Sequence, residues 1–213
     1  MKVIVVASQK GGVGKTTLTG HLGVAASREG AVTALVDCDP QGSLSDWWNV
    51  REAEDPILAS VDVGSLKEYL GKLESAGVEL VVIDTPPSVT KTIADVVGVA
   101  DLVLIPTRPS PHDLRAVGAT VDIVEAAGKS MVFVVNGAAP RARITGEAAI
   151  SLSQYGKVAP VTIFQRTDFA ASMVDGRTVM ELDPEGRSAS EVGVLWGYLK
   201  DQLERSKKVV SHG

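Results

Sequence analysis

Two lysines and two threonines are set among three glycines in one short segment, residues 9–17, with the sequence QKGGVGKTT. Glycines allow successive backbone N–H groups to point at a single anion. Lys15 can reach the β- and γ-phosphates of a nucleotide, and the hydroxyl group of Thr16 can bind Mg²⁺. This composition and spacing predict a loop that binds the phosphates of a nucleotide.

The residues on either side of this segment predict the elements that hold it. Residues 3–7, VIVVA, form an apolar run typical of a buried strand. Leu18, Leu22 and Ala25 have the spacing of one face of a helix. A strand, a glycine-rich loop and a helix are the context that a phosphate site needs, because the helix N-terminus adds its positive end.

Acidic side chains follow two further apolar runs. Residues 31–36 lead into Asp37, which begins the sequence DCDPQ, and residues 80–83 lead into Asp84. Carboxylates that lie near a phosphate loop can face both a nucleotide and its metal ion. Alone, the pair formed by Asp39 and the proline after it would be an ordinary turn. The phosphate loop close before it favours a role for Asp39 at the nucleotide.

Apolar runs typical of strands alternate along the chain with segments of helical spacing. This alternation predicts an α/β fold with a mostly parallel, twisted sheet flanked by helices on both faces. We expect one domain spanning residues 1–213. Ligands of such sheets bind at the carboxyl ends of the strands, where the phosphate loop, Asp37, Asp84 and Asn136 all fall. The six predicted strands are 3–7, 31–36, 80–83, 102–105, 131–135 and 158–163.

Composition excludes several classes of protein. The chain has 213 residues and a formal net charge of −5, so any nucleic acid must bind to a local basic patch. Cys38 is the single cysteine, which excludes an internal disulfide or a cysteine-rich metal site. No apolar run reaches the ~18 residues of a membrane span. The run at 3–7 lacks the length and cleavage site of a signal peptide, so we expect a cytoplasmic location and no membrane.

The phosphate loop departs from the general pattern G-x-x-x-x-G-K-[ST] because Gln9 stands in place of the first glycine, with a second lysine, Lys10, after it. The motif K-G-G-x-G-K-T-T is the deviant Walker A motif. The sequence DCDPQ looks like the Walker A′ motif, and LVVID, which ends at Asp84, looks like Walker B. These three motifs resemble those of the ParA/MinD family of ATPases. The resemblance to this family covers nearly the whole chain.

The resemblance implies ATP and Mg²⁺ as ligands and assigns a role to each matching residue. Lys10 would reach across a nucleotide-sandwiched dimer to the partner's phosphates, and Asp39 would position the attacking water. Lys15 would stabilise charge on the transferring phosphate. Thr16, Asp37 and Asp84 would serve the Mg²⁺ shell. The nucleotide-binding residues would be Lys10, Gly11, Gly12, Val13, Gly14, Lys15, Thr16, Thr17, Asn136, Phe164 and Arg166, of which the last three would lie near the adenine. Relatives often have proline in place of Phe164.

Within the family, the chain is most like a short ParA-type partition ATPase without an N-terminal helix-turn-helix. Such proteins form homodimers on ATP–Mg²⁺, bind nucleoid DNA without sequence preference, and hydrolyse ATP slowly until a small ParB-like or other cargo adaptor stimulates them. The alternative is a nucleotide-switched dimeric regulator without DNA transport. Basic residues that could form a DNA patch are Arg141, Arg143, Lys157, Arg187, Lys200, Arg205, Lys207 and Lys208.

Two further segments have open interpretations. Trp47 and Trp48 are either partly buried packing residues, which we favour, or a contact site for a partner. The proline-rich segment 106–115 is either a stiff loop with a helix cap or, by resemblance, a segment near a dimer interface. We expect His112, within it, to be a surface residue.

Overall fold

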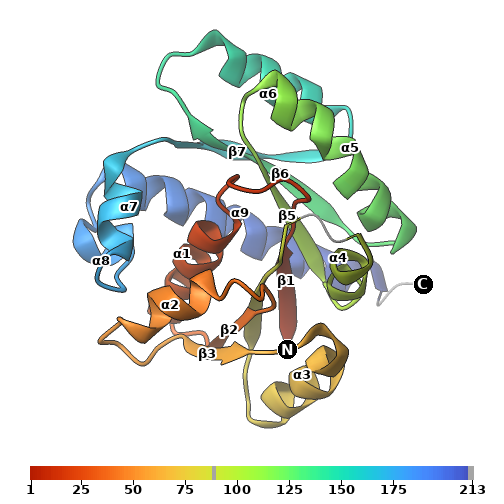
Figure 1. Ribbon diagram of the computed structural model, residues 1–213, viewed down its shortest axis with the longest axis vertical. Coiled ribbons are helices and arrows are strands. Elements are labelled where there is room, and N and C mark those ends of the chain that lie inside the picture. Colours follow the sequence, from red (N-terminus) through yellow and green to blue (C-terminus); the bar gives the residue numbers. More distant parts are fainter. Residues whose placement is uncertain (88–89, 211–213) are drawn as a thin grey trace.

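The computed structural model describes the backbone of residues 1–87 and 90–210 and the side chains of residues 1–87 and 91–205. Within these residues, seven strands form one sheet in the order β3-β2-β4-β1-β5-β6-β7, and every neighbouring pair is parallel (Figure 1). The predicted α/β fold is confirmed. The strands are β1 (Lys2–Val6), β2 (Thr33–Asp37), β3 (Ile57–Ser60), β4 (Leu80–Asp84), β5 (Leu102–Thr107), β6 (Met131–Ala138) and β7 (Lys157–Phe164).

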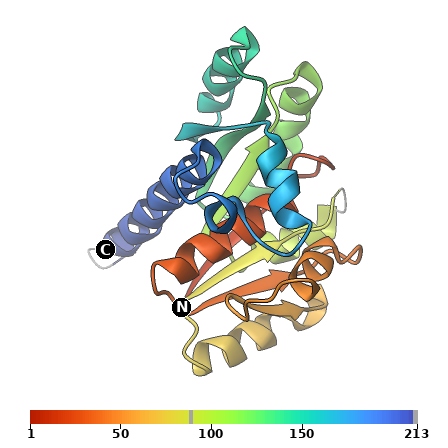
Figure 2. The ribbon, with the colours of Figure 1, turned by 90° about the vertical axis from the view of Figure 1, so that its left-hand side faces the viewer.

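Helices cover both faces of the sheet, as Figures 1 and 2 show. Successive strand residues point to opposite faces, so Ile4 and Val6 belong to one core layer while Val3 and Val5 belong to the other. The first layer is covered by α1 (Lys15–Arg28), α2 (Ser43–Asn49), α7 (Thr167–Met173), α8 (Val179–Leu182) and α9 (Arg187–Val210). The second is covered by α3 (Leu66–Ser75), which follows the 3₁₀ turn η1 (Val63–Ser65), and by α4 (Thr90–Val97), α5 (Pro111–Ala126) and α6 (Arg143–Ser153).

The six predicted strands are present with ends shifted by up to three residues, and two differences bear on the site. The sequence pattern did not predict β3, because its four residues, ILAS, are too few to show a period and lie half exposed at the edge of the sheet. The predicted strand 131–135 continues to Ala138, with a register shift between Asn136 and Ala138 where it pairs with β7. Asn136 therefore lies within β6 rather than just beyond its end.

The register of the central strands sets the position of the acidic residues. Asp84, at the end of β4, pairs with Val6 of β1 on one side and with Asp37 of β2 on the other. The loop that follows β1 therefore leaves the sheet directly beside both carboxylates. None of the described helices is long and apolar enough to span a membrane.

Candidate nucleotide-binding site

The phosphate loop joins β1 to α1 in the predicted strand–loop–helix arrangement. Gly14 precedes the first helical residue with φ of +92°, a conformation that L side chains rarely adopt. A Cβ atom at Gly14 would also lie only 2.3 Å from Nδ2 of Asn136. No described side chain caps the start of α1, and residues 14–17 at this start line a cavity, so a ligand there could accept from the first N–H groups of the helix. Glycine is required here for both backbone conformation and space.

Lys15 is buried at the first position of α1, with 7% of its surface exposed. Its Nζ lies 3.4 Å from the carbonyl oxygen of Lys10, and no described carboxylate forms an ion pair with it. Burial lowers the pKa of Lys15, while the charges of Asp84 and Asp39 oppose this shift. A buried ammonium group without an ion-pair partner is suited to an incoming phosphate.

Thr16 and Asp84 form the part of the site that suits Mg²⁺. The Thr16 hydroxyl donates a 2.6 Å hydrogen bond to Oδ2 of Asp84, and the buried Oδ1 has no hydrogen-bond partner among the described residues. Burial raises the pKa of Asp84 to about 7, the Thr16 hydrogen bond opposes this shift, and the nearby Asp37 adds to it. A cation would satisfy the orphaned oxygen, so these two residues fit the predicted metal ion.

The two Walker A′ aspartates take different positions. Oδ1 of Asp37 accepts the N–H of Asp39 at 3.1 Å, and Oδ2 accepts the N–H and hydroxyl of Ser45 at 2.9 and 2.8 Å. Asp37 thus holds the loop to the start of α2, and its predicted role in the Mg²⁺ shell stays a prediction. Asp39 faces the phosphate cavity, where its Oδ1 also accepts the N–H of Gln41 at 3.0 Å.

A cavity of about 790 Å³ lies over the phosphate loop. Seven of the predicted residues line it: Gly11, Gly12, Gly14, Lys15, Thr16, Thr17 and Asp39. Val13, within the loop, is buried and does not line the cavity, and Lys10 is exposed and does not line it either. The placement of Lys10 leaves its ammonium group accessible to a second molecule, while its role across a dimer stays a prediction.

A second cavity, of about 270 Å³, adjoins the first and brings together the residues predicted near the adenine. Asn136, Phe164 and Arg166 line it together with Gly14 and Thr17 of the loop. The side chain of Asn136 donates a 2.6 Å hydrogen bond to the carbonyl oxygen of Val13, so it also fixes the loop. Contact of these residues with the base stays a prediction.

Arg166 and Phe164 make contacts within the chain at the edge of this second cavity. Arg166 forms a 2.6 Å ion pair with Glu191, and its guanidinium lies 5.3 Å from the Phe164 ring centroid. The backbone N–H of Phe164 also donates to Glu191, at 3.1 Å. Glu191 on α9 therefore fixes the end of β7 beside the cavity.

Several lining residues were not predicted from the sequence. Asp46, Trp47 and Val50 reach the first cavity from α2 and the residue after it, and Met173 and Val174 reach it from the end of α7. None of these residues belongs to a nucleotide motif, so only the folded chain reveals that the two helices meet at the cavity rim. Arg108 also lines both cavities.

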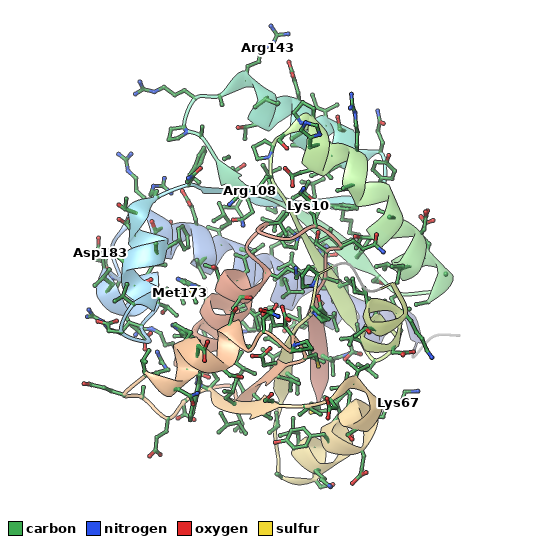
Figure 3. All side chains as sticks on the ribbon, viewed as in Figure 1. Lys10, Lys67, Arg108, Arg143, Met173 and Asp183 are labelled. Atoms are coloured by element: carbon green, nitrogen blue, oxygen red, sulfur yellow. The ribbon has the colours of Figure 1, made fainter. Side chains whose placement is uncertain are left out.

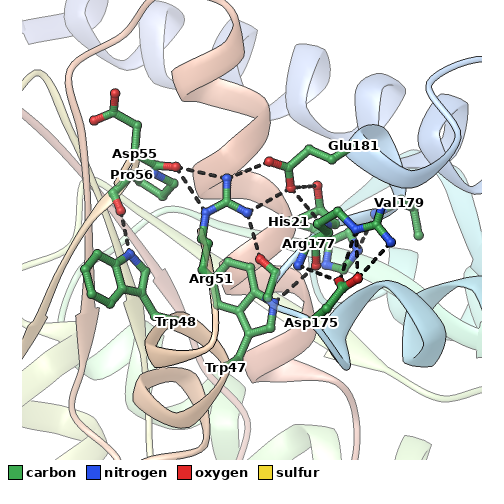
Figure 4. A network of polar contacts seen from close by, with 12 residues as sticks. His21, Trp47, Trp48, Arg51, Asp55, Pro56, Asp175, Arg177, Val179 and Glu181 are labelled. Atoms are coloured by element: carbon green, nitrogen blue, oxygen red, sulfur yellow. Dashed lines mark hydrogen bonds and ion pairs between the residues drawn. The ribbon is translucent and has the colours of Figure 1, made fainter. Parts of the chain in front are cut away.

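A polar network joins α2 to the segment before α8 and is drawn in Figure 4. Arg51 pairs with Glu181 at 2.6 Å and donates to the carbonyl oxygen of Gly176 at 2.7 Å. The indole N–H of Trp47 donates to Arg177 O at 3.2 Å, and that of Trp48 donates to Pro56 O at 2.8 Å. Trp47 is buried and Trp48 packs against the same core layer, so the packing interpretation of this pair is confirmed.

The proline-rich segment 106–115 contains the helix cap of one of its two open interpretations, and the capping residue is Ser110. Its hydroxyl accepts the N–H of Asp113 at 3.1 Å and donates to the Asp113 carboxylate, with Pro111 at the first position of α5. His112 is exposed, as expected. The position of the segment near a dimer interface stays a prediction.

The parallel sheet, the phosphate loop and the acids at adjacent strand ends define a phosphate-loop nucleotide-binding protein. The profile of the family described as "CobQ/CobB/MinD/ParA nucleotide binding domain" matches residues 4–179. The chain therefore belongs to this family, and it is an ATPase of the ParA/MinD type with a deviant Walker A motif.

Similar proteins span most of the chain. Maintenance of carboxysome distribution protein A from Halothiobacillus neapolitanus is 33% identical over 199 residues, covering 88% of this chain and 91% of that protein. Chromosome-partitioning ATPase Soj from Thermus thermophilus is 26% identical over 224 residues, covering 91% and 78%. The structure of septum site-determining protein MinD from Pyrococcus horikoshii, complexed with Mg-ADP, matches with a TM-score of 0.81 at 17% identity, covering 96% and 98%. At this low sequence identity, the similarity to the MinD structure shows a shared fold.

Proposed function

We propose that this chain is a positioning ATPase that binds ATP and Mg²⁺, dimerises on ATP, binds DNA without sequence preference and moves a large cargo. The observation that carries the proposal is the rim of the phosphate cavity. Val50 and Val174 on this rim are 54% and 79% exposed, and the phosphate loop beside it carries the exposed Lys10. A second copy on this rim would cover the apolar side chains and supply its own lysine.

In the proposed reaction, water displaces ADP from the γ-phosphate of ATP. Lys15 neutralises charge on the transferring phosphate, and the N–H groups of the loop hold the other phosphate oxygens. Thr16 and Asp84 would hold Mg²⁺, which would supply positive charge next to the phosphates during the transfer. The carboxylate of Asp39 accepts a hydrogen bond from the attacking water and orients it. Lys10 of the second copy completes the charge stabilisation, so that hydrolysis depends on the dimer.

The cargo is proposed from the similar proteins. One of them is named for carboxysome distribution and another for chromosome partitioning. We propose that the cargo here is such a body, a plasmid or a chromosomal locus, attached through a small adaptor protein that stimulates hydrolysis. The ATPase would then work in the cytoplasm, on the nucleoid while it holds ATP.

DNA binding requires a local patch, because the formal net charge is −5. Three of the predicted basic residues are already engaged: Arg143 with Glu147 at 2.8 Å, Lys200 with Glu29 at 2.9 Å, and Lys157 with Gln202 at 2.7 Å. Figure 3 shows Arg143 at the outer surface. The side chains of Lys207 and Lys208 lie outside the described ones. Among the predicted basic residues, Arg141, Arg187 and Arg205 are exposed and form no ion pair in the described structure.

A mobility-shift assay on two unrelated DNA duplexes tests this function. We expect binding with ATP–Mg²⁺ but not with ADP, and a steep loss of affinity as salt rises, because phosphate contacts release counterions. Arg187→Glu and Arg205→Glu should weaken DNA binding several-fold without changing ATP affinity, whereas Lys67→Glu on α3 is the control. Equal binding with ADP, or none with ATP at low salt, would contradict the proposal. Dimerisation on ATP without DNA binding would favour the nucleotide-switched regulator.

A further inference from the structure

Arg108 stands where the two cavities of the site meet. It follows the last residue of β5, Thr107, and is itself followed by Pro109. The described residues that line both cavities are Gly14, Thr17, Arg108 and Met173, and only Arg108 of these carries a charge. Figure 3 shows Arg108 near the phosphate loop, and Met173 shares its position between the cavities. A cation therefore lies between the phosphate end and the base end of the site.

The guanidinium group of Arg108 has no protein partner in the described structure. No hydrogen bond or ion pair of this side chain occurs among the described residues, and the side chain is exposed. The arginines elsewhere around the site differ in this respect, since Arg51 pairs with Glu181 and Arg166 pairs with Glu191. The positive charge of Arg108, where the two cavities meet, is therefore available to a ligand.

Gly137 lets the Arg108 side chain lie close to β6. Gly137 has φ of +65°, and a Cβ atom there would be 3.4 Å from Nε of Arg108. Thr107 pairs with Val135 in the neighbouring strand, which brings Arg108 beside the segment that contains Asn136 and Gly137. The stem of Arg108 is thus supported on the strand that also fixes the phosphate loop.

We propose that Arg108 binds the nucleotide of its own subunit, with its guanidinium on the α-phosphate. The loop and Lys15 account for the β- and γ-phosphates, and the second cavity accounts for the base, which leaves the linking part of the nucleotide at the junction. The planar guanidinium group presents several donors in a geometry that suits a phosphate oxygen pair. Arg108 therefore strengthens the binding of ATP and ADP alike. This inference rests on the proposed function only in its choice of adenine nucleotide.

The test compares the affinities of wild-type protein, Arg108→Gln and Arg108→Lys for ATP, ADP and adenosine by calorimetry with Mg²⁺. Arg115→Gln is the matched control, because Arg115 is an exposed arginine on α5 that lines neither cavity. We expect Arg108→Gln to lose about tenfold in affinity for both ATP and ADP, since a hydrogen bond to a charged group is lost. Arg108→Lys should lose less, and adenosine affinity and the control should be unchanged.

Three results would overturn the inference: no loss in Arg108→Gln, a loss confined to ATP, or an equal loss for adenosine. A loss confined to ATP would mean that the γ-phosphate is the contact, and an equal loss for adenosine would mean that the contact is to the base or the ribose. The thermal unfolding temperature without nucleotide should match that of wild type, because the side chain is exposed and has no protein partner. If wild-type protein binds both nucleotides while Arg108→Gln equals it, only this inference fails. If wild type binds neither, the proposed function fails with it.

Discussion

The Thr16 hydroxyl donates to one oxygen of Asp84 at 2.6 Å, while the other oxygen of this buried carboxylate has no partner among the described residues. A buried acceptor without a donor is costly unless a ligand satisfies it. Burial raises the pKa of Asp84, and a cation next to the carboxylate would lower this pKa again because it stabilises the charged form. The hydrogen bond between Thr16 and Asp84 thus connects the start of α1 to the end of β4 at the place where the site is suited to hold a metal ion.

Asp84→Asn should weaken the effect of Mg²⁺ on ATP binding and hydrolysis, because the amide keeps the shape of the carboxylate but not its charge. The Mg²⁺ affinity of the ATP complex should fall by at least about 10- to 100-fold, since the loss of an outer contact to a metal ligand alone costs that much. Titration of Mg²⁺ at a fixed ATP concentration, with ATP binding and hydrolysis as readouts, measures this loss. Asp95→Asn, an exposed aspartate on α4, is the control. An unchanged Mg²⁺ dependence in Asp84→Asn would contradict the assignment.

Lys15→Ala should remove the protection that ATP–Mg²⁺ gives against thermal unfolding, because the buried contact to the β- and γ-phosphates is lost. At a ligand concentration of about 100 times the Kd, wild-type protein should gain about 2.7 kcal/mol in free energy of unfolding. Lys67→Ala on α3, far from the phosphate loop in Figure 3, should keep the full protection. Normal protection in Lys15→Ala would show that the loop does not bind phosphates.

His21 should make folding stability depend on pH. It is fully buried on α1, where Nδ1 donates to Thr17 O at 2.7 Å and Nε2 accepts the N–H of Val179 at 3.2 Å, so the ring is neutral. Burial lowers its pKa to about 4, against the opposing hydrogen bond to Thr17. The unfolded chain therefore binds a proton first as pH falls from about 6.5, and stability decreases until about pH 4, by about 3 kcal/mol in total.

Chemical denaturation between pH 7 and pH 4 measures this dependence. His21→Gln should flatten the curve relative to wild type over this range, whatever its stability at pH 7. His112→Gln is the control, because His112 is exposed. Parallel curves for wild type and His21→Gln would show that His21 does not carry the predicted pH dependence.

Motifs that are local in sequence predicted the phosphate side of the site. Residues 9–14 form the loop before α1 and residues 15–17 begin this helix as expected, because the glycines and the helix start are specified by neighbours along the chain. The same holds for Asp84 at the end of its apolar strand. Asp37 shows the limit, since its Oδ2 is held by Ser45, eight residues away, and nothing in the pattern DCDPQ indicates that contact.

Contacts between distant segments explain what the sequence did not predict. The cavity rim joins Val50 to Val174, and the network of Figure 4 joins Arg51 to Glu181 across 130 positions. Such contacts depend on tertiary packing and leave no local period. The edge strand β3 was missed for a related reason, because it is defined by pairing with β2 and not by its own short, half-exposed sequence.

Complementation between two inactive variants tests the central claim, that a second copy completes the site. Lys10→Ala and Asp39→Ala should each hydrolyse almost no ATP alone. In a mixed dimer, the site on the Lys10→Ala subunit has its own Asp39 and receives Lys10 from the other subunit. We predict that mixing the two proteins restores ATP turnover to about the level expected for one working site per mixed dimer. No turnover in the mixture, with both variants folded and still binding ATP, would contradict the shared site.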